Sequence, residues 1–169
     1  MIFEIGEKVV HPQHGVGEVV KFADRAFGSG VKKQYYEVSI PGGSTVWVPL
    51  EPQTFGLRKL ASKREIAKCR KILASKPSPL ADDARVRQSE LASRLKEGTL
   101  AAQCEVVRDL FAYGEHKSLY GTIANFFRTT QDVLYDEWSI VENITVHEAA
   151  QEISELLDKS RQKVSKAKA

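Results

Sequence analysis

Short runs of β-branched and aromatic residues, separated by glycine-rich turns, fill the first sixty positions of the chain. Four of these runs have the length and composition of strands, at residues 8–10, 17–23, 34–40 and 45–49. Pro41-Gly42-Gly43-Ser44 is a strong turn signal between the last two runs. An open sheet of such short strands would leave its edges unpaired, so we predict a small antiparallel β-barrel over residues 1–60.

From Ser62 onward, apolar residues recur with the period of an α-helix, and five helices are predicted. Ser62 and Glu65 have the spacing of a capping box, and Thr145 and Glu148 repeat that spacing before the last helix. Prolines near 76–81 mark a linker inside a helical domain of residues 61–159, and we expect residues 160–169 to form a frayed basic tail. The predicted fold class is α+β, a β-barrel followed by an all-α bundle.

The net charge of +3 is unevenly distributed along the chain. Residues 60–76 carry six basic side chains and one acidic side chain, and residues 158–169 carry five and one. Residues 77–157 carry seven basic and fourteen acidic side chains, so most of the predicted helical domain is acidic. Because a duplex-binding surface is normally a basic face, this distribution argues against strong autonomous DNA binding.

Hydrophobic residues make up 42 % of the chain, but no run is long enough to cross a membrane. The first residues lack the basic and apolar regions of a secretory signal, so we expect a cytoplasmic protein. Cys69 and Cys104 are far apart and show no metal-binding spacing, which favours two buried thiols in a reducing compartment.

The histidines and carboxylates do not form a recognisable catalytic or metal-binding pattern. His11 and His14 flank a proline-containing turn, where a structural role is favoured over a zinc site because more ligands would be needed. Asp82 and Asp83 precede a predicted helix, where the helix dipole favours negative charge. We therefore expect no enzyme, no metal or other cofactor and no small-molecule substrate.

The aromatic residues divide into two groups. Phe126, Phe127 and Trp138 occur at helical spacing and are predicted to lie in the core. Trp47 lies in a predicted strand and faces opposite to the valines on either side of it. If those valines fill the barrel, Trp47 projects outward as an interface anchor, whereas the reverse orientation would place it inside; the sequence favours neither.

Several motifs together resemble one known family. In the first domain they are Phe3-x-x-Gly6-x-x-Val9-Val10-x-Pro12-x-x-Gly15, Tyr35-Tyr36, Val46-x-Val48-Pro49 and Gly56-Leu57-Arg58. In the helical domain they are Leu91-x-x-x-Leu95-x-x-Gly98 and Val106-Val107-Arg108-Asp109-Leu110. With these residues the chain resembles the CarD/CdnL family of bacterial RNA polymerase-binding transcription regulators over nearly its whole length.

The resemblance implies a Tudor-like N-terminal barrel that binds the RNA polymerase β subunit, in part by pairing strand edges. It also implies a helical domain that lies at the upstream edge of the melted promoter and stabilises the open complex. In that family a tryptophan wedges into the minor groove there. Such a regulator would be found in the cytoplasm, associated with the nucleoid.

The resemblance points to particular residues and to two departures from the family pattern. Arg25 keeps the register of a basic polymerase-contact residue, and Trp47 stands where some relatives have an arginine, beside Val48 and Pro49. We expect these four residues to contact polymerase.

In the helical domain Ala84 replaces the wedge tryptophan, which leaves Arg85 and Arg87 for weak phosphate contacts without sequence specificity. The alternative is a protein–protein adaptor on polymerase that does not contact DNA.

Overall fold

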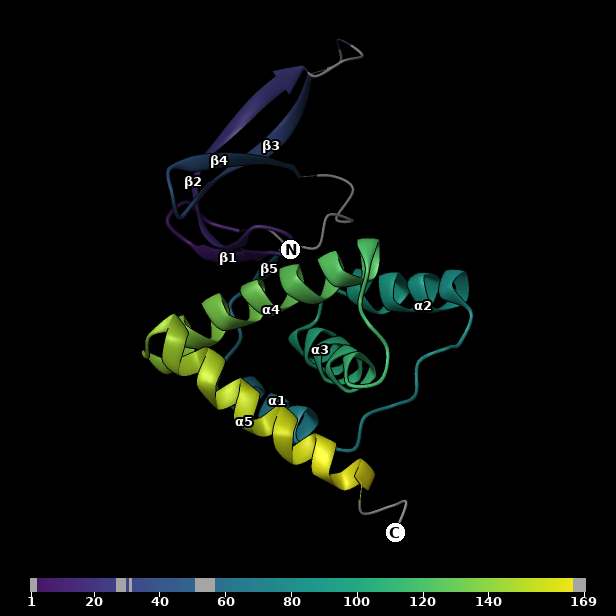
Figure 1. The fold of residues 1–169 in the computed structure, drawn as a ribbon. Coiled ribbons are helices and arrows are strands. Elements are labelled where there is room, and N and C mark those ends of the chain that lie inside the picture. The colour runs from purple at the N-terminus through teal and green to yellow at the C-terminus, as the bar shows by residue number, and fades with distance from the viewer. Residues whose placement is uncertain (1–2, 27–29, 31, 51–56, 166–169) are drawn as a thin grey trace. The chain divides into compact units, whose positions relative to one another are not determined.

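The computed structural model describes residues 3–26, 30, 32–50 and 57–165. For residues 164 and 165 it describes the backbone only. The chain divides into two compact units, residues 1–60 and 61–169. The first unit contains an antiparallel five-stranded sheet and the second contains five helices (Figure 1), which confirms the predicted α+β class. Gly56, a residue of the family motif, lies outside the described residues.

The sheet of the first unit has the strand order β4-β3-β2-β1-β5 and curves strongly (Figure 1). Its strands are β1 (Lys8–His11), β2 (Gly15–Ala26), β3 (Lys32–Ile40), β4 (Ser44–Pro49) and β5 (Arg58–Lys59). In the described residues β4 pairs with β3 alone, so β4 is an edge strand. Closure of a barrel was expected to remove such edges, but no ladder between described residues joins β4 to β5.

Two glycine positions allow the strands to come together as they do. A Cβ atom on Gly17 would lie 2.6 Å from a side-chain carbon of Val38, so only glycine permits this close approach of β2 and β3. The predicted turn between β3 and β4 contains Gly42 and Gly43, whose φ angles of 94° and 82° are unfavourable for other residues. Strand β2 is longer at both ends than the sequence indicated.

The inner face of the sheet forms the core of the first unit. Val9, Val19 and Val38 are fully buried there, and Phe3 packs edge-on against the Tyr36 ring at 5.5 Å between ring centres. The two-residue strand β5 was not predicted, because its pairing with β1 and the ion pair between Lys59 and Glu7 (2.6 Å) are tertiary contacts.

The second unit is built around α3. Its helices are α1 (Lys63–Leu73), α2 (Ala84–Lys96), α3 (Leu100–Gly114), α4 (Gly121–Glu142) and α5 (Val146–Ser165). Helix α3 packs against each of the other four helices, as its central place within the unit in Figure 1 indicates. Cys69, Cys104 and Trp138 are buried together in the larger core, and Phe127 packs against both cores of this unit.

The predicted helix starts are confirmed by their capping hydrogen bonds. The Glu65 N–H donates to the Ser62 hydroxyl, and the Ser62 N–H donates to the Glu65 carboxylate at 2.7 Å. Thr145 and Glu148 make the same pair of bonds before α5. Within the described residues no helix is long and apolar enough to span a bilayer.

The expected fraying from residue 160 is wrong for residues 160–165, because α5 continues to Ser165. Ser160 is buried, and its hydroxyl donates to the Ser75 carbonyl at 2.5 Å. The Lys163 ammonium donates to the Ala74 carbonyl at 2.7 Å. These contacts with the end of α1 hold a polar segment that has no strong helix signal of its own. Residues 166–169 lie outside the described part of the chain.

Candidate interaction sites

The orientation of Trp47, which the sequence left open, is decided by its neighbours on β4. Val48 is buried in the sheet core, and Val46 packs against that core from a partly buried position. Because side chains alternate along a strand, Trp47 lies on the opposite, outer face of the sheet, where it is half-buried. The interpretation of Trp47 as an outward-facing side chain is therefore the correct one.

A β-bulge in β2 places Arg25 on the same outer face. The pairing register with β3 shifts between Val19 and Lys21, so that Val19 faces the core while Lys21 pairs with Glu37 on the outside. A one-residue shift of this kind inverts the face of every later side chain in the strand. Arg25 thereby shares its face with Trp47, and its guanidinium carbon lies 4.3 Å from the centre of the indole ring.

The other two predicted polymerase-contact residues occupy different positions. The side chain of Val48 is buried and belongs to the core, so it supports the strand and is not itself exposed for contact. Pro49 is half-buried and alternates with Val48, on the face of Trp47. Because β4 is an edge strand, its backbone N–H and C=O groups that do not bond to β3 point away from the sheet.

The second candidate site is the start of α2, where the structure separates the two predicted DNA-contact residues. Asp83 caps the helix by accepting from the N–H groups of Arg85 and Val86, both at 2.9 Å. The Arg85 side chain is exposed. Arg87 instead donates through Nη1 to the carbonyls of Ala81 (2.7 Å) and Asp82 (2.9 Å).

Two residues that the sequence analysis did not single out complete this region. The Arg87 guanidinium carbon lies 4.8 Å from the centre of the Tyr113 ring, and the Lys117 ammonium lies 5.6 Å from the same ring. Lys117 also pairs with Asp82 at 3.0 Å, which lowers the pKa of the Asp82 carboxyl. Lys117 thus lies beside the Asp82 carboxylate, and Arg87 connects the linker to α2 and α3.

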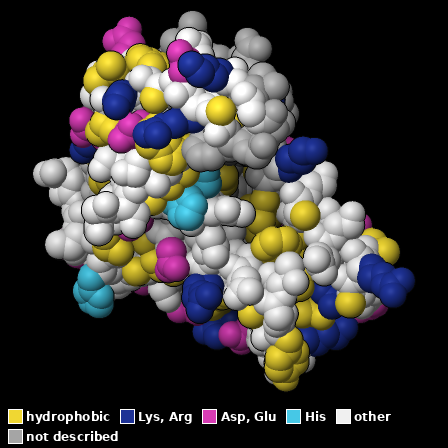
Figure 2. Space-filling view, turned by 90° about the horizontal axis from the view of Figure 1, so that it is seen from above, with side chains coloured by type: hydrophobic (Ala, Val, Ile, Leu, Met, Phe, Trp, Pro, Cys, Tyr) yellow, Lys and Arg dark blue, Asp and Glu magenta, His cyan; other side chains and the backbone are white. Residues whose placement is uncertain are grey.

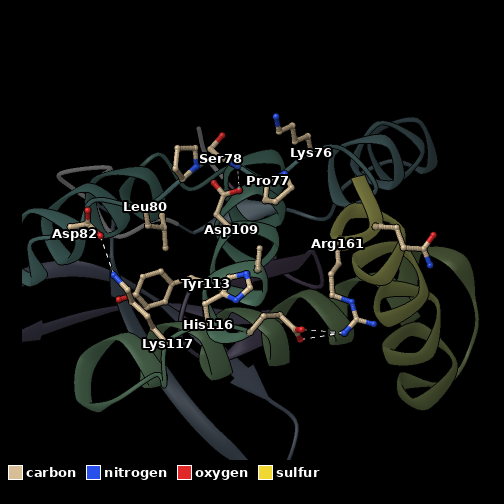
Figure 3. A pocket seen from close by; sticks show the side chains of 14 residues that line it. Lys76, Pro77, Ser78, Leu80, Asp82, Asp109, Tyr113, His116, Lys117 and Arg161 are labelled. Carbon is tan, nitrogen blue, oxygen red and sulfur yellow. Dashed lines mark hydrogen bonds and ion pairs between the residues drawn. The ribbon is translucent and has the colours of Figure 1, made fainter. Parts of the chain in front are cut away.

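A network of charges holds the predicted linker against the helices. Asp109 is fully buried and accepts from Arg108 and Arg94, both at 2.8 Å, and from the Ser78 N–H at 2.9 Å. Beside it lies a cavity of about 710 Å³, into which Leu80, Tyr113 and His116 project (Figure 3). Arg108 and Asp109 belong to a motif of the family resemblance, but the sequence did not indicate that they are buried together, because their partners Ser78 and Arg94 come from elsewhere in the chain.

His11, the last residue of β1, and His14, in the turn that follows, form a tilted pair of rings. The ring centres of His11 and His14 lie 4.6 Å apart, and His11 Nδ1 accepts from the Gln13 N–H at 3.1 Å. Burial, with a smaller contribution from His14, lowers the pKa of His11 to about 4. In the part of the chain that the structure describes, no group of three or more His, Cys, Asp or Glu side chains could hold a metal ion.

Figure 2 shows how charged side chains are distributed on one face of the protein. On that face, Lys and Arg side chains are scattered, with Asp and Glu side chains among them, and do not form a continuous basic stripe. A protein that holds many phosphates by itself would need such a stripe.

Two family models match the chain in succession. Residues 3–60 match the CarD-like/TRCF RID domain, and residues 68–154 match the CarD C-terminal domain. The chain belongs to the CarD-like family. It is also 23 % identical to a Bacillus subtilis (strain 168) protein described as "Putative transcription factor YdeB", over 146 residues that cover 85 % of this chain and 95 % of that protein.

Membership of the CarD-like family makes this protein a transcription-associated regulator that interacts with RNA polymerase. The first matched range coincides with the unit that carries Arg25 and Trp47, and the second lies in the helical unit that carries Arg85. The two candidate sites thus belong to different modules of the family.

Proposed function

We propose that this CarD-like protein binds the β subunit of RNA polymerase through the outer face of its N-terminal sheet. The observation that carries this proposal is the stack of Arg25 on Trp47 beside the edge strand β4. A half-buried indole held by a cation is a suitable interface anchor, since tryptophan and arginine are the residue types most enriched among binding hot spots.

The edge of β4 offers a second means of attachment to the same partner. Its outward N–H and C=O groups can pair with a strand of the β subunit, and Val48 keeps the edge in place from the core side. Pro49 ends the available ladder, because proline has no N–H to donate. Trp47 and Pro49 then supply the side-chain contacts on the outer face.

The helical unit adds a weak contact with promoter DNA and so modulates the stability of the open complex. Arg85 is exposed and, among the described residues, makes none of the carbonyl contacts that engage Arg87, so Arg85 carries most of the phosphate contact. Attachment to polymerase provides a high local concentration, which makes a weak, sequence-independent contact effective. The protein is then carried with polymerase on the nucleoid.

A protein–protein adaptor that does not touch DNA is the second candidate. Ala84 in place of the wedge tryptophan, the acidic composition of residues 77–157 and the engagement of Arg87 with the linker all favour it. The two candidates differ in the salt dependence that they predict, since only phosphate contacts release counterions from DNA.

The test compares binding of the full chain to polymerase alone and to a polymerase–promoter complex over a series of salt concentrations. A steeper loss of affinity with salt for the promoter complex supports the DNA contact, and the Arg85→Gln variant should reduce that difference in slope by about 1. Equal slopes in both settings would assign the helical unit to protein contacts alone. No binding to polymerase in either setting would refute both candidates.

A further inference from the structure

A small hollow lies where the start of α2 meets the segment between α3 and α4. Its volume is about 290 Å³, which is small for a drug-sized ligand but leaves room for one planar ring. Its lining includes Ala84 and Arg87 of α2, Tyr113 of α3 and Tyr120 at the start of α4. The hollow therefore opens beside Ala84, whose small side chain leaves it unfilled on the α2 side.

Tyr120 provides an aromatic side chain at this hollow from another element. It is 76 % exposed, the highest value among the exposed large hydrophobic and aromatic side chains of the described residues. Its hydroxyl makes no hydrogen bond with any described residue. Tyr120 also occupies the N-cap of α4, where no side chain caps the helix. Serine, threonine, aspartate or asparagine at this position would stabilise the helix, so an exposed tyrosine here has no evident structural reason.

The hollow is lined by a positive charge, although the part of the chain around it is acidic in composition. Arg87 is its one charged lining residue in the described chain, although residues 77–157 carry an excess of acidic side chains. The two carboxylates that precede α2 are both engaged, since Asp83 caps the helix and Asp82 pairs with Lys117. Arg85 follows Ala84 and is exposed. An exposed aromatic ring near arginine side chains suits a nucleic-acid base, whose backbone phosphate is negatively charged.

We propose that Tyr120 is a stacking platform for an unpaired DNA base, which enters the hollow beside Ala84 while Arg85 contacts the neighbouring phosphate. This inference rests on the proposed DNA contact of the helical unit and names the residue that contacts the base. The first N–H groups of α4, which have no acceptor within the helix, favour the same negatively charged backbone.

The experiment titrates the full chain, at low salt, into a forked DNA that carries 2-aminopurine at its first unpaired position, and into a fully paired duplex of the same sequence. The variants are Tyr120→Leu, which removes the ring, and Tyr120→Phe, which keeps the ring and removes the hydroxyl. Neither variant removes a capping bond, because Tyr120 makes none. Binding of each variant to polymerase without DNA is measured in parallel.

We expect the wild type and Tyr120→Phe to prefer the fork and to change the 2-aminopurine fluorescence on binding. Tyr120→Leu should bind the fork about tenfold more weakly and the duplex equally well, as expected for the loss of one base–aromatic stack. Equal affinity of wild type for fork and duplex, an unchanged fork affinity of Tyr120→Leu, or no binding to the fork would each overturn the inference. Competition by deoxyadenosine monophosphate as effective as that of the fork would also overturn it, in favour of a free nucleotide.

The parallel measurement separates this inference from the proposed function. A chain that binds polymerase but shows no effect of Tyr120→Leu on the fork refutes the stacking role alone. A chain that does not bind polymerase refutes the proposed function, whatever it does with forked DNA.

Discussion

The guanidinium carbon of Arg25 lies 4.3 Å from the centre of the Trp47 ring, although β3 separates the strands that carry these two residues. The bulge between Val19 and Lys21 makes this contact possible, because it inverts the facing of β2 and turns Arg25 outward. The cation holds the indole on the outer face of the sheet. Trp47 is thus oriented before any partner binds, which reduces the entropy lost on association.

Replacement of Val48 tests the inner side of the same strand. We expect Val48→Ala to lower the free energy of unfolding by about 1–3 kcal/mol, because it removes apolar atoms from a buried site and leaves a cavity. Below the melting temperature polymerase binding should be nearly unchanged. Chemical denaturation, followed by binding measured on the folded variant, checks both parts. A stable variant that binds poorly would place Val48 in the interface instead.

Replacement of Asp109 tests the network that holds the linker. Asp109→Asn removes the charge that Arg94 and Arg108 share, and we expect it to lower the free energy of unfolding by about 2–4 kcal/mol. Urea denaturation followed by far-ultraviolet circular dichroism measures the change.

The matched control for this experiment is Asp82→Asn. The Asp82 side chain is 95 % exposed in its pair with Lys117, so its replacement should leave the free energy of unfolding nearly unchanged. Similar effects of the two replacements would contradict the structural role of the buried network.

The lowered pKa of His11 predicts a dependence of stability on pH. The unfolded chain binds a proton on this side chain below about 6.5, whereas the folded chain does so only below about 4. Between these values the unfolded state binds more protons, so stability decreases as the pH falls from the higher value to the lower one. For a half-buried ring that solvent partly screens, we expect an effect on the order of 1 kcal/mol.

The variant that isolates this effect is His11→Asn, whose side-chain oxygen can accept the bond from the Gln13 N–H without titrating. Free energies of unfolding are compared between about pH 7 and about pH 4.5, across most of the window between the two pKa values. We expect a smaller loss for the variant than for the wild type, since the carboxylates and the other histidines are the same in both proteins. Equal losses would show that His11 contributes nothing to the acid sensitivity.

The parts of the fold that were predictable from sequence depend on local signals. The capping pairs at Ser62 and Thr145 determine helix starts through bonds within four residues, so their spacing alone was sufficient. The end of α5 was not predictable, because the burial of Ser160 depends on the Ser75 carbonyl far away in sequence. The short strand β5 was missed for the same reason, since its pairing with β1 is a tertiary contact.

The candidate sites were predictable in part. Alternation along a strand gives the relative facing of Trp47 and Val48, but not which of them faces the core. The facing of Arg25 depends on a bulge that no residue pattern in β2 announces. Arg85 and Arg87 are alike in sequence, and only the position of the linker carbonyls and Tyr113 separates an exposed arginine from an engaged one.

The most direct test of the account is the affinity of the full chain for the isolated RNA polymerase β subunit, measured for wild type, Trp47→Ala and Trp47→Phe. The ring lies outside the core, so both variants should fold normally by circular dichroism. We predict that Trp47→Ala weakens binding by about tenfold or more and that Trp47→Phe restores part of it. Wild-type affinity in a folded Trp47→Ala variant would contradict the proposed docking face.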